Sequence, residues 1–497
     1  MTPVNRDIFR GVLSVLSGKV AILLISIVTT PVIVRLLGPT DYGDYSFVLS
    51  VLSILSIFIV TSIRTSLRKY LSENIEDKRW VTAVFGVYVH IGIALIIISA
   101  IIIVLVVTIL QKVGFIGHPM DKYMLILAIV LLGNQIYGIS WSSLMGYNLE
   151  HYAEGLNAIR KIILSAVGIG LLLTGFGVLG LLFAHVLAGF LSGLLGIWAL
   201  RNKLDLKRAV FSFTGYSKIS MDRILRYNLA STALILLTAS LYHTDIILLR
   251  VLTGSTETGI YKASLQIAEF LWFAPTAIHA VFVHSTSELW ENGQIQRITE
   301  LASIATRYTL LLSLLLAIGL GALADSLIPI YFGSEFNRSI GPLLILLPGV
   351  IGFAVAKPIY AIGQGNGRLR ALILATGIAS LINLVLNAVL IPKYGIFGAG
   401  VSTSISYLSM IFLHIMSAQE IGFNPIADLR LFRIIIVSVT SSTIIYIFDR
   451  LILSDIISLV IIPPIGFLIF AGLCITTGAI DSDEVKTIFN KITNTEV

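Results

Sequence analysis

The chain has 497 residues, of which 56% are hydrophobic and only 12% are charged. A globular protein carries about 25% charged residues, so this composition excludes an ordinary water-soluble enzyme and is typical of a protein dissolved in lipid. The formal net charge is +7, but the basic residues form neither a continuous stripe nor a nucleic-acid-binding module. We therefore expect a membrane protein without a nucleic-acid partner.

Apolar runs that are long enough to cross a bilayer recur along the whole chain, separated by short polar connections. One crossing needs about 20 predominantly apolar residues, so we predict an all-α polytopic membrane protein with about fourteen transmembrane helices. The predicted spans are 13–37, 45–63, 81–110, 122–146, 156–174, 178–200, 228–250, 257–283, 305–324, 341–363, 371–391, 395–417, 431–448 and 455–477.

Lysine and arginine residues are concentrated in alternate connections, chiefly 64–79 and 201–226. Cytoplasmic connections carry such an excess in membrane proteins, so the pattern predicts a multi-pass protein of the cell membrane with both termini in the cytoplasm. Two interpretations of the two basic connections stay open. They either contact lipid headgroups or serve only to set the topology.

The sequence repeats itself at a shift of roughly 215 residues. Three pairs of segments match in the same order: 35–45 with 250–261, 155–160 with 365–370, and 176–180 with 394–398. Each copy holds an even number of predicted spans, which makes the copies parallel, and such repeats typically place a substrate site between them.

The repeat predicts a domain organisation of two parallel six-helix bundles, residues 1–200 and 228–417. A basic cytoplasmic linker, 201–227, joins the bundles, and residues 418–497 hold two further helices and a cytoplasmic tail.

Ionisable residues inside the spans are candidate substrate contacts, because a charge at mid-span costs at least about 2.5 kcal/mol. In the span 257–283, Lys262, Gln266 and Glu269 are spaced to share one side of a helix. Asp245 and Lys19 lie in two other spans. For Glu269 and Asp245 a buried structural pair is the alternative, and Lys19 could extend toward the cytoplasm. The histidines are scattered without a second ligand at metal spacing, so we expect no metal and no cofactor.

Four segments resemble a known family, the polysaccharide-transport branch of the multidrug/oligosaccharidyl-lipid/polysaccharide exporter superfamily. They are VRLLGPTDYGDYS, TDIILLRVLTGSTETGIYKAS, IYFGSEFNRSIGPL and LINLVLNAVLIPKYGIFGAGVSTSISY. The resemblance implies a V-shaped exporter fold made of two six-helix bundles. It also implies a flippase, not an enzyme, that moves a lipid-linked oligosaccharide on a polyprenyl or dolichyl carrier to the outer leaflet by alternating access.

The resemblance further implies that cationic residues hold the phosphate or pyrophosphate of the carrier. The candidates are Lys19, Arg35, Arg64 and Arg250, and Asp245, Lys262, Gln266 and Glu269 complete the predicted site. The implied partners are the lipid-linked oligosaccharide and membrane lipids, with a coupling ion or proton and glycan-assembly enzymes as further candidates.

Two alternative functions remain. A drug or cation antiporter of the same superfamily would share the fold, and fold alone does not decide function. A membrane oligosaccharide polymerase would also be polytopic. The predicted outer connections are short, however, and they contain neither paired carboxylates nor a cluster of arginine and histidine.

Overall fold

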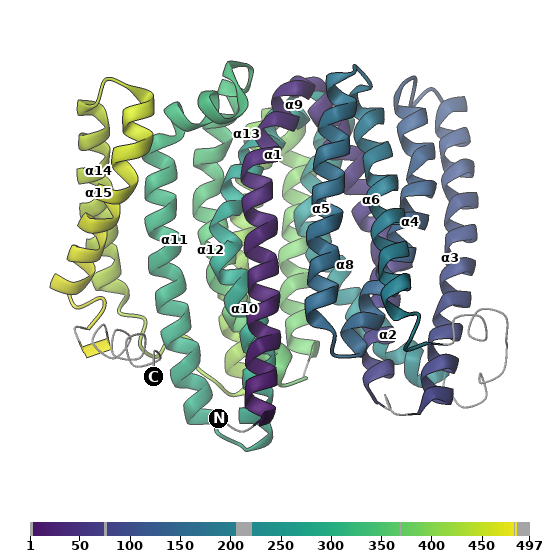
Figure 1. Cartoon of the computed structure of the whole chain (residues 1–497). Coiled ribbons are helices and arrows are strands. Elements are labelled where there is room, and N and C mark those ends of the chain that lie inside the picture. The colour runs from purple at the N-terminus through teal and green to yellow at the C-terminus, as the bar shows by residue number, and fades with distance from the viewer. Residues whose placement is uncertain (1–2, 74–76, 205–220, 368, 482, 485–497) are drawn as a thin grey trace. The chain divides into compact units, whose positions relative to one another are not determined.

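The computed structural model describes residues 3–73, 77–204, 221–367, 369–481 and 483–484. Throughout these ranges the regular structure is helical, and they contain no strand (Figure 1). The chain divides into two compact units, residues 1–259 (unit 1) and 260–497 (unit 2). These units are defined by packing, whereas the predicted bundles were defined by the repeat. Residues 205–220 of the predicted linker lie outside the described ranges, and the predicted domain boundaries stay a prediction.

Unit 1 contains the N-terminal helices and the start of α9. Its elements are α1 (Pro3–Ser56), the π-helix η1 (Ile57–Thr61), α2 (Ser62–Glu73), α3 (Lys78–Lys112), α4 (Met120–Gly146), α5 (Glu150–Leu173), α6 (Gly177–Leu200) and α8 (Met221–Leu252).

Unit 2 contains the remaining helices. Its elements are α9 (Ser255–Ala268, counted here from Ile260), the 3-10 helix η3 (Glu269–Trp272), α10 (Phe273–Glu291), α11 (Ile295–Phe332), η4 (Ser334–Ser339), α12 (Ile340–Gly365), α13 (Leu369–Ile421), α14 (Leu431–Leu451) and α15 (Asp455–Thr476).

Two of these helices are too long for one membrane crossing, and each contains a turn. A helix of 54 residues, the length of α1, would measure about 80 Å, whereas the hydrocarbon core is about 30 Å thick. In α1 the non-helical residue is Gly38 (φ 65°, ψ 175°), which is followed by Pro39. In α13 it is Gly395 (φ 55°, ψ −129°). Glycine adopts such positive φ values without the steric cost that a side chain would add.

By length and composition, 12 helices in the described part of the chain are able to cross a membrane. Two of them, Gly18–Ser72 and Leu369–Ile421, contain the turns just described and are long enough for two crossings each. This agrees with a multi-pass membrane protein. The exact number of fourteen crossings stays a prediction.

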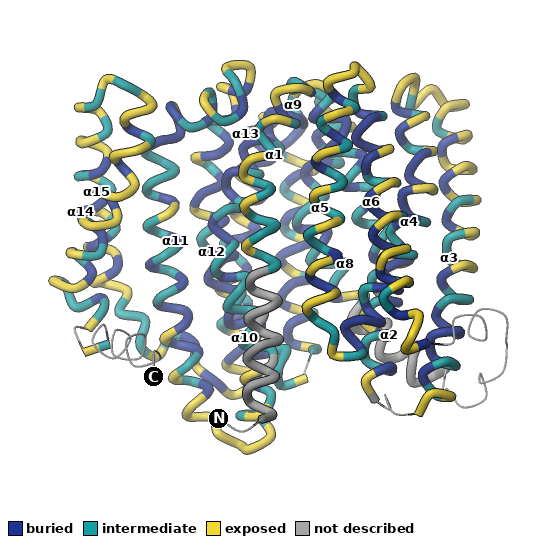
Figure 2. The backbone as a smooth tube through the Cα atoms, viewed as in Figure 1, coloured by how far each residue is buried: buried dark blue, intermediate teal, exposed yellow. Residues whose placement is uncertain are grey.

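Burial separates the helices in the interior of each unit from those that face lipid (Figure 2). In unit 1 the most apolar part of α4 is 61% buried, whereas that of α3 is 17% buried. In unit 2, α12 is the most enclosed helix, at 67%, and α14 and α15 are 22% buried. Because lipid solvates apolar side chains, exposed isoleucine and leucine on α3, α14 and α15 are the expected outer surface of a membrane protein.

A charged network holds α14 and α15 against α11. Arg307 of α11 is fully buried and pairs through Nη1 with Asp428 Oδ2 at 2.7 Å and through Nη2 with Glu484 Oε1 at 2.6 Å. Arg430 pairs with Asp428 at 2.9 Å and with Asp481 at 2.7 Å. These residues come from α11, from the connection before α14 and from the segment after α15, so the network joins three separate parts of unit 2.

Candidate functional site

The eight predicted site residues belong to both units and are described unit by unit. Unit 1 contains Lys19, Arg35, Arg64, Asp245 and Arg250, and unit 2 contains Lys262, Gln266 and Glu269.

Arg250, at the end of α8, is engaged in an ion pair. Its Nε donates to Asp44 Oδ1 at 2.6 Å, and Ser255 Oγ donates to the same oxygen at 2.7 Å. Asp44 is only 8% exposed. The guanidinium of Arg250, which was predicted to bind phosphate, therefore already has an anionic partner. The sequence did not indicate that Asp44 is this partner.

The same region contains a contact between repeat-related turns, which we call the turn contact. Thr40 Oγ1 and Thr256 Oγ1 are hydrogen-bonded at 2.8 Å across a separation of 216 positions. A Cβ atom added to Gly43 would lie 1.8 Å from the carbonyl oxygen of Ser255, and one added to Gly259 would lie 1.9 Å from that of Pro39. The equivalent residues Thr40 and Thr256, Gly43 and Gly259, and Pro39 and Ser255 are each separated by 216 positions. The turn contact is therefore made of equivalent residues and has local two-fold symmetry.

Asp245 lies one turn before Arg250 on α8 and is fully buried. Its Oδ1 accepts a hydrogen bond from the backbone N–H of Ile246 at 2.8 Å. The role of Asp245, as a substrate contact or as a member of a buried structural pair, stays a prediction. Lys19 is partly exposed and Arg35 is exposed, so both cations lie at the surface of unit 1.

Unit 1 contains one more candidate site residue, Arg160, which was not predicted from the sequence. Arg160 of α5 and the predicted Arg64 of α2 both lie over the ring of Tyr137, with 4.6 Å and 5.8 Å from Cζ to the ring centre. Arg64 also lies 4.2 Å from the ring centre of Trp141, and Arg160 Nη2 donates to Asn134 Oδ1 at 2.7 Å. We call these five residues the arginine–aromatic cluster.

A second layer of polar contacts fixes Tyr137. Its hydroxyl donates to Asn157 Oδ1, and Asn157 Nδ2 donates to Glu154 Oε2 at 3.0 Å. Tyr137 and Trp141 are four residues apart on α4 and therefore share one face of the helix. Sequence reasoning could have found Arg160, because the rule that nominated Lys19, a cation inside a predicted span, applies equally to it.

In unit 2 the structure brings two of the three predicted residues together. Lys262 Nζ and Glu269 Oε2 are 3.7 Å apart. Gln266 lies one turn after Lys262 on α9, and Glu269 begins the 3-10 helix η3. A 3-10 segment within a long helix often marks a hinge or a strained sequence. The polar stripe that the sequence predicted thus contains one ion pair and one change of helix type.

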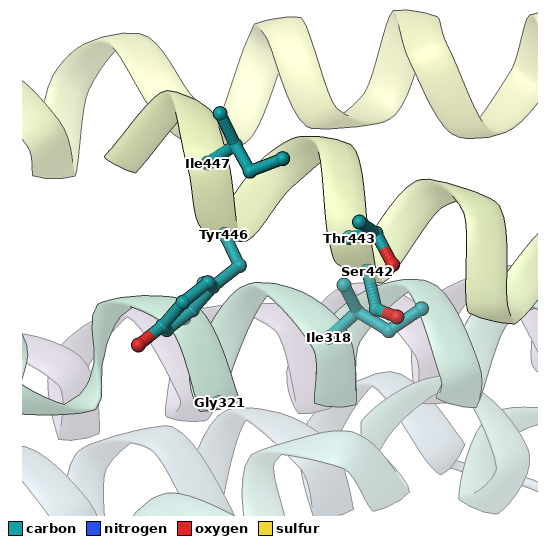
Figure 3. Close-up of a pocket in the computed structure, with 7 residues that line it drawn as sticks. Ile318, Gly321, Ser442, Thr443, Tyr446 and Ile447 are labelled. Carbon is teal, nitrogen blue, oxygen red and sulfur yellow. The ribbon is translucent and has the colours of Figure 1, made fainter. Parts of the chain in front are cut away.

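Unit 2 also has a groove of about 430 Å³ between α11 and α14 (Figure 3). Its lining is mostly apolar and includes three hydroxyl groups: Ile318, Gly321, Ala322, Ser442, Thr443, Tyr446 and Ile447. The groove contains none of the eight predicted residues, so it is separate from the charged candidates. Within the described ranges, no group of three or more His, Cys, Asp or Glu side chains could hold a metal ion.

The long apolar helices and the polar clusters enclosed between them define a multi-pass α-helical membrane protein. The chain belongs to the polysaccharide biosynthesis protein family, whose model matches residues 8–272, more than half of the sequence. A second model, lipid II flippase MurJ, matches residues 260–463.

Known proteins of similar sequence and structure agree with this family. The probable low-salt glycan biosynthesis flippase Agl15 of Haloferax volcanii is 24% identical over 391 residues, which cover 76% of this chain and 77% of the relative. The lipid II flippase MurJ in an inward closed conformation has a TM-score of 0.70 at 15% identity and covers 98% of this chain and 99% of its own. An inward-facing multidrug resistance MATE transporter has a TM-score of 0.67 at 15% identity, with 81% and 94% covered.

These similarities confirm the predicted all-α exporter fold and the resemblance to the polysaccharide-transport branch. The two solved structures are related to the chain by fold alone, because their sequence identity is low.

Proposed function

We propose that the chain is a flippase that transfers a lipid-linked oligosaccharide from the cytoplasmic to the outer leaflet by alternating access. The translocated saccharide would serve surface polysaccharide or glycoprotein synthesis. Membership of the polysaccharide biosynthesis family over residues 8–272 is the observation that carries this proposal. Similarity to a curated glycan-biosynthesis flippase over three-quarters of both chains supports it.

The physical task explains why polar residues are enclosed in apolar bundles. A saccharide and a phosphate cannot enter hydrocarbon without polar partners, whereas the lipid tail can stay in the bilayer. Arg64 and the pairs Arg250 with Asp44 and Lys262 with Glu269 supply such partners. In this proposal Lys19, Arg35 and Gln266 are further substrate contacts, and Glu269 is the candidate for binding a coupling proton or cation.

The proposed direction of transfer requires a defined orientation. With both termini in the cytoplasm, the basic connections near Arg68 and Arg201 face the compartment in which activated sugars are made. Enzymes that assemble the lipid-linked saccharide would then supply the substrate, and enzymes on the outer face would consume it.

Deletion of the protein, followed by analysis of lipid-linked saccharides, tests the function. We expect the surface glycan to be lost while its complete lipid-linked precursor accumulates on the cytoplasmic side, where an added glycosidase cannot reach it in intact cells. Precursor that reaches the outer face and remains unpolymerised would instead identify a polymerase.

The fold likeness to a multidrug resistance MATE transporter favours one second candidate, a drug or cation antiporter. In that case deletion would raise sensitivity to cationic compounds and leave the glycan and its precursor unchanged.

A further inference from the structure

We propose that Thr376, His414 and Ser417 of unit 2 form an internal water site, the histidine site, in which His414 binds and releases a proton. The inference rests on the proposed function and deepens it, because it identifies the coupling ion as a proton. The three residues belong to α13 and are 0%, 0% and 4% exposed. None of them was a predicted site residue, and none lines the groove between α11 and α14.

The two arms of α13, before and after its turn, lie side by side both above and below the histidine site. Nearer the turn, Asn383 Nδ2 of the first arm is 3.5 Å from Thr403 Oγ1 of the second. At the far end, a Cβ atom added to Gly363 would lie 2.9 Å from Leu372 and 3.3 Å from Ile421. These last two residues belong to different arms, so the arms are also close there.

Thr376 and His414 lie at the same depth of this hairpin. Each is 19 positions from Gly395, the residue at the turn. At 1.5 Å per residue, both are therefore about 28 Å from the turn. This depth falls between the two contacts that hold the arms together, so the two side chains belong to one enclosed level of the hairpin.

The helix faces that carry these side chains are the faces by which the arms meet. Thr376 precedes Asn383 by seven positions, and His414 follows Thr403 by eleven. Both spacings are close to whole numbers of helical turns, so each residue shares a face with a member of the contact between the arms. Ser417 follows His414 by three positions and lies on the same side of the second arm.

Four polar atoms of the histidine site lack a hydrogen-bond partner among the described residues. They are Nδ1 and Nε2 of His414, Oγ1 of Thr376 and Oγ of Ser417. Elsewhere on α13, the hydroxyls of Ser402 and Ser406 donate to a backbone carbonyl one turn earlier, at 2.8 Å and 2.6 Å. The two hydroxyls of the histidine site do not, so they are left for another partner.

These four atoms are the kind of group that internal water binds. An unpaired buried polar atom costs free energy, and native proteins pair such atoms with protein groups or with ordered water. A neutral imidazole offers one donor and one acceptor, and each hydroxyl offers both. A buried water typically makes two to four hydrogen bonds, which three polar side chains at one depth supply.

A row of aromatic rings connects His414 with a partly exposed residue. Tyr360 of α12 contacts His414 edge to face, with 5.3 Å between the ring centres. Tyr360 also stacks on His279 of α10, at 5.6 Å. His279 is partly exposed, whereas His414 is fully buried. The row therefore leads from an accessible side chain to the enclosed histidine site.

The charged and titratable neighbours of His414 are few. α12 packs against α13, and its titratable residues are Tyr360 and Lys357. The ammonium of Lys357 lies 5.1 Å from the ring centre of Trp272, in a separate aromatic group. On α13 itself, Arg370 and Glu420 are exposed.

No carboxylate of the described ranges forms an ion pair with His414. The buried Arg307, in contrast, pairs with two carboxylates. An unpaired charge in an apolar interior is expensive, so His414 is neutral while the hairpin is closely packed and takes up a proton where water reaches it. A group whose charge follows its hydration can bind a proton in one access state and release it in the other, and intramembrane histidines serve proton relays in this way.

Radiolytic oxidation of the full chain in nanodiscs, read by mass spectrometry, tests for internal water. Met410 is one turn before His414 and 2% exposed, and Met145, the reference, is 6% exposed in an apolar core of unit 1. We expect Met410 to be oxidised at least about fivefold faster than Met145, because hydroxyl radicals form from water next to the side chain. The double variant Thr376→Val with Ser417→Ala should slow the oxidation of Met410 severalfold and leave Met145 unchanged. Equally slow oxidation of both methionines in the wild type would overturn the water site.

Flipping of a labelled lipid-linked saccharide in liposomes with an imposed pH gradient tests the proton. We expect the wild-type rate to change severalfold with the gradient. His414→Phe keeps the ring contact with Tyr360 and removes the titratable nitrogens, and His414→Gln keeps a polar side chain. Both variants should lose the response to the gradient. His151→Gln is the matched control, because His151 is exposed at the start of α5, and it should respond as the wild type does.

The outcomes separate the inference from the proposed function. A wild-type response to the gradient in both folded His414 variants would overturn the proton-binding role. Wild-type flipping that does not depend on the gradient would also overturn it and would leave the function in place. A wild type that does not flip the saccharide at all would refute the function, whereas the oxidation of Met410 would still report the water site. Thermal unfolding in detergent identifies folded variants, and the glutamine variant keeps the test usable if His414→Phe unfolds.

Discussion

Asp44 accepts two hydrogen bonds at one carboxylate oxygen, from Arg250 Nε and from Ser255 Oγ. It stands in a repeat motif, and its partner Arg250 is 206 positions away. Removing one member of an enclosed ion pair is more costly than removing both, because the remaining charge keeps its desolvation penalty without compensation.

We therefore expect Asp44→Asn to lower the free energy of unfolding by about 2 to 4 kcal/mol, since Arg250 would lose its carboxylate. The double variant Asp44→Asn with Arg250→Gln should lose less than the sum of the two single variants. Thermal unfolding in detergent measures the stability of the two single variants and of the double variant. Lys112→Gln is the control, because Lys112 is exposed in the last turn of α3. Strict additivity of the two single variants would contradict a direct pair.

Glu269 and Lys262 pose a different question, which is whether their 3.7 Å pair only stabilises unit 2 or also takes part in transport. Glu269→Gln keeps the shape of the side chain and removes the charge. If the carboxylate binds a coupling proton or cation, this variant should reach the membrane in normal amounts and lose flipping, and Glu269→Asp should retain part of the activity.

The exchange of the two charges, Lys262→Glu with Glu269→Lys, separates the two roles. It should restore thermal stability without restoring flipping. Wild-type flipping by Glu269→Gln would eliminate the coupling role, and recovery of transport by the exchanged pair would show that the pair is structural.

At the scale of elements, the turn contact depends on two glycines that face backbone carbonyls. Alanine at Gly43 or Gly259 would bring Cβ within 1.8 Å or 1.9 Å of a carbonyl oxygen, so the turns must separate. We expect either substitution to prevent the contact.

A cysteine pair, Thr40→Cys with Thr256→Cys in a Cys474→Ala background, should form a disulfide under mild oxidation, because the two native hydroxyl oxygens are 2.8 Å apart. Adding Gly43→Ala should reduce the yield of this disulfide severalfold. An unchanged yield would show that the glycine is not required for the approach. Mobility on a non-reducing gel reports the cross-link.

The charged network around Arg307 predicts how α14 and α15 respond to pH. The hydrogen bond from Arg430 lowers the pKa of Asp481 below its ordinary value of 3.8. A carboxylate with a lowered folded-state pKa contributes stability above the ordinary value, and this contribution is lost as the pH falls through the folded-state pKa. We expect unfolding temperatures to fall more steeply below pH 4 in the wild type than in Asp481→Asn. Parallel pH profiles of the two proteins would contradict this.

Truncation tests the same network at neutral pH. A chain that ends at Ile480 lacks Asp481 and Glu484, so the buried Arg307 loses one of its two carboxylates. This truncation should destabilise the protein, whereas a chain that ends at Glu484 keeps all the described ion pairs. Comparison of the two unfolding temperatures isolates the network from the remainder of the tail.

For the whole molecule, the class of fold could be predicted from the sequence because apolar length alone decides which segments can cross a bilayer. The turn of α1 was also predictable, since Gly38 and Pro39 interrupt an apolar run. The contacts between residues that lie far apart in the sequence were not predictable. Nothing local in the sequence indicates that Arg307 contacts Glu484, 177 positions away, or that Arg160 and Arg64 lie over one tyrosine.

Orientation is the remaining prediction at this scale. In a Cys474→Ala background, Ser72→Cys should be shielded from an impermeant thiol reagent in intact cells, whereas Glu335→Cys should react, because both positions are exposed and the basic connections are predicted to be cytoplasmic. The opposite labelling pattern would reverse the orientation and the proposed direction of transfer.

The turn contact also constrains how the two copies of the repeat can change during evolution. Thr40 is hydrogen-bonded to its repeat equivalent Thr256. Gly43 faces Ser255 and Gly259 faces Pro39, and Ser255 and Pro39 are repeat equivalents of each other. Each turn therefore forms part of the surface that the other turn contacts. A contact of this kind is isologous, as in the interface of a symmetric homodimer. A substitution that enlarges one turn therefore requires a compensating change 216 positions away, and related sequences should vary together at these paired positions even where the copies have otherwise diverged.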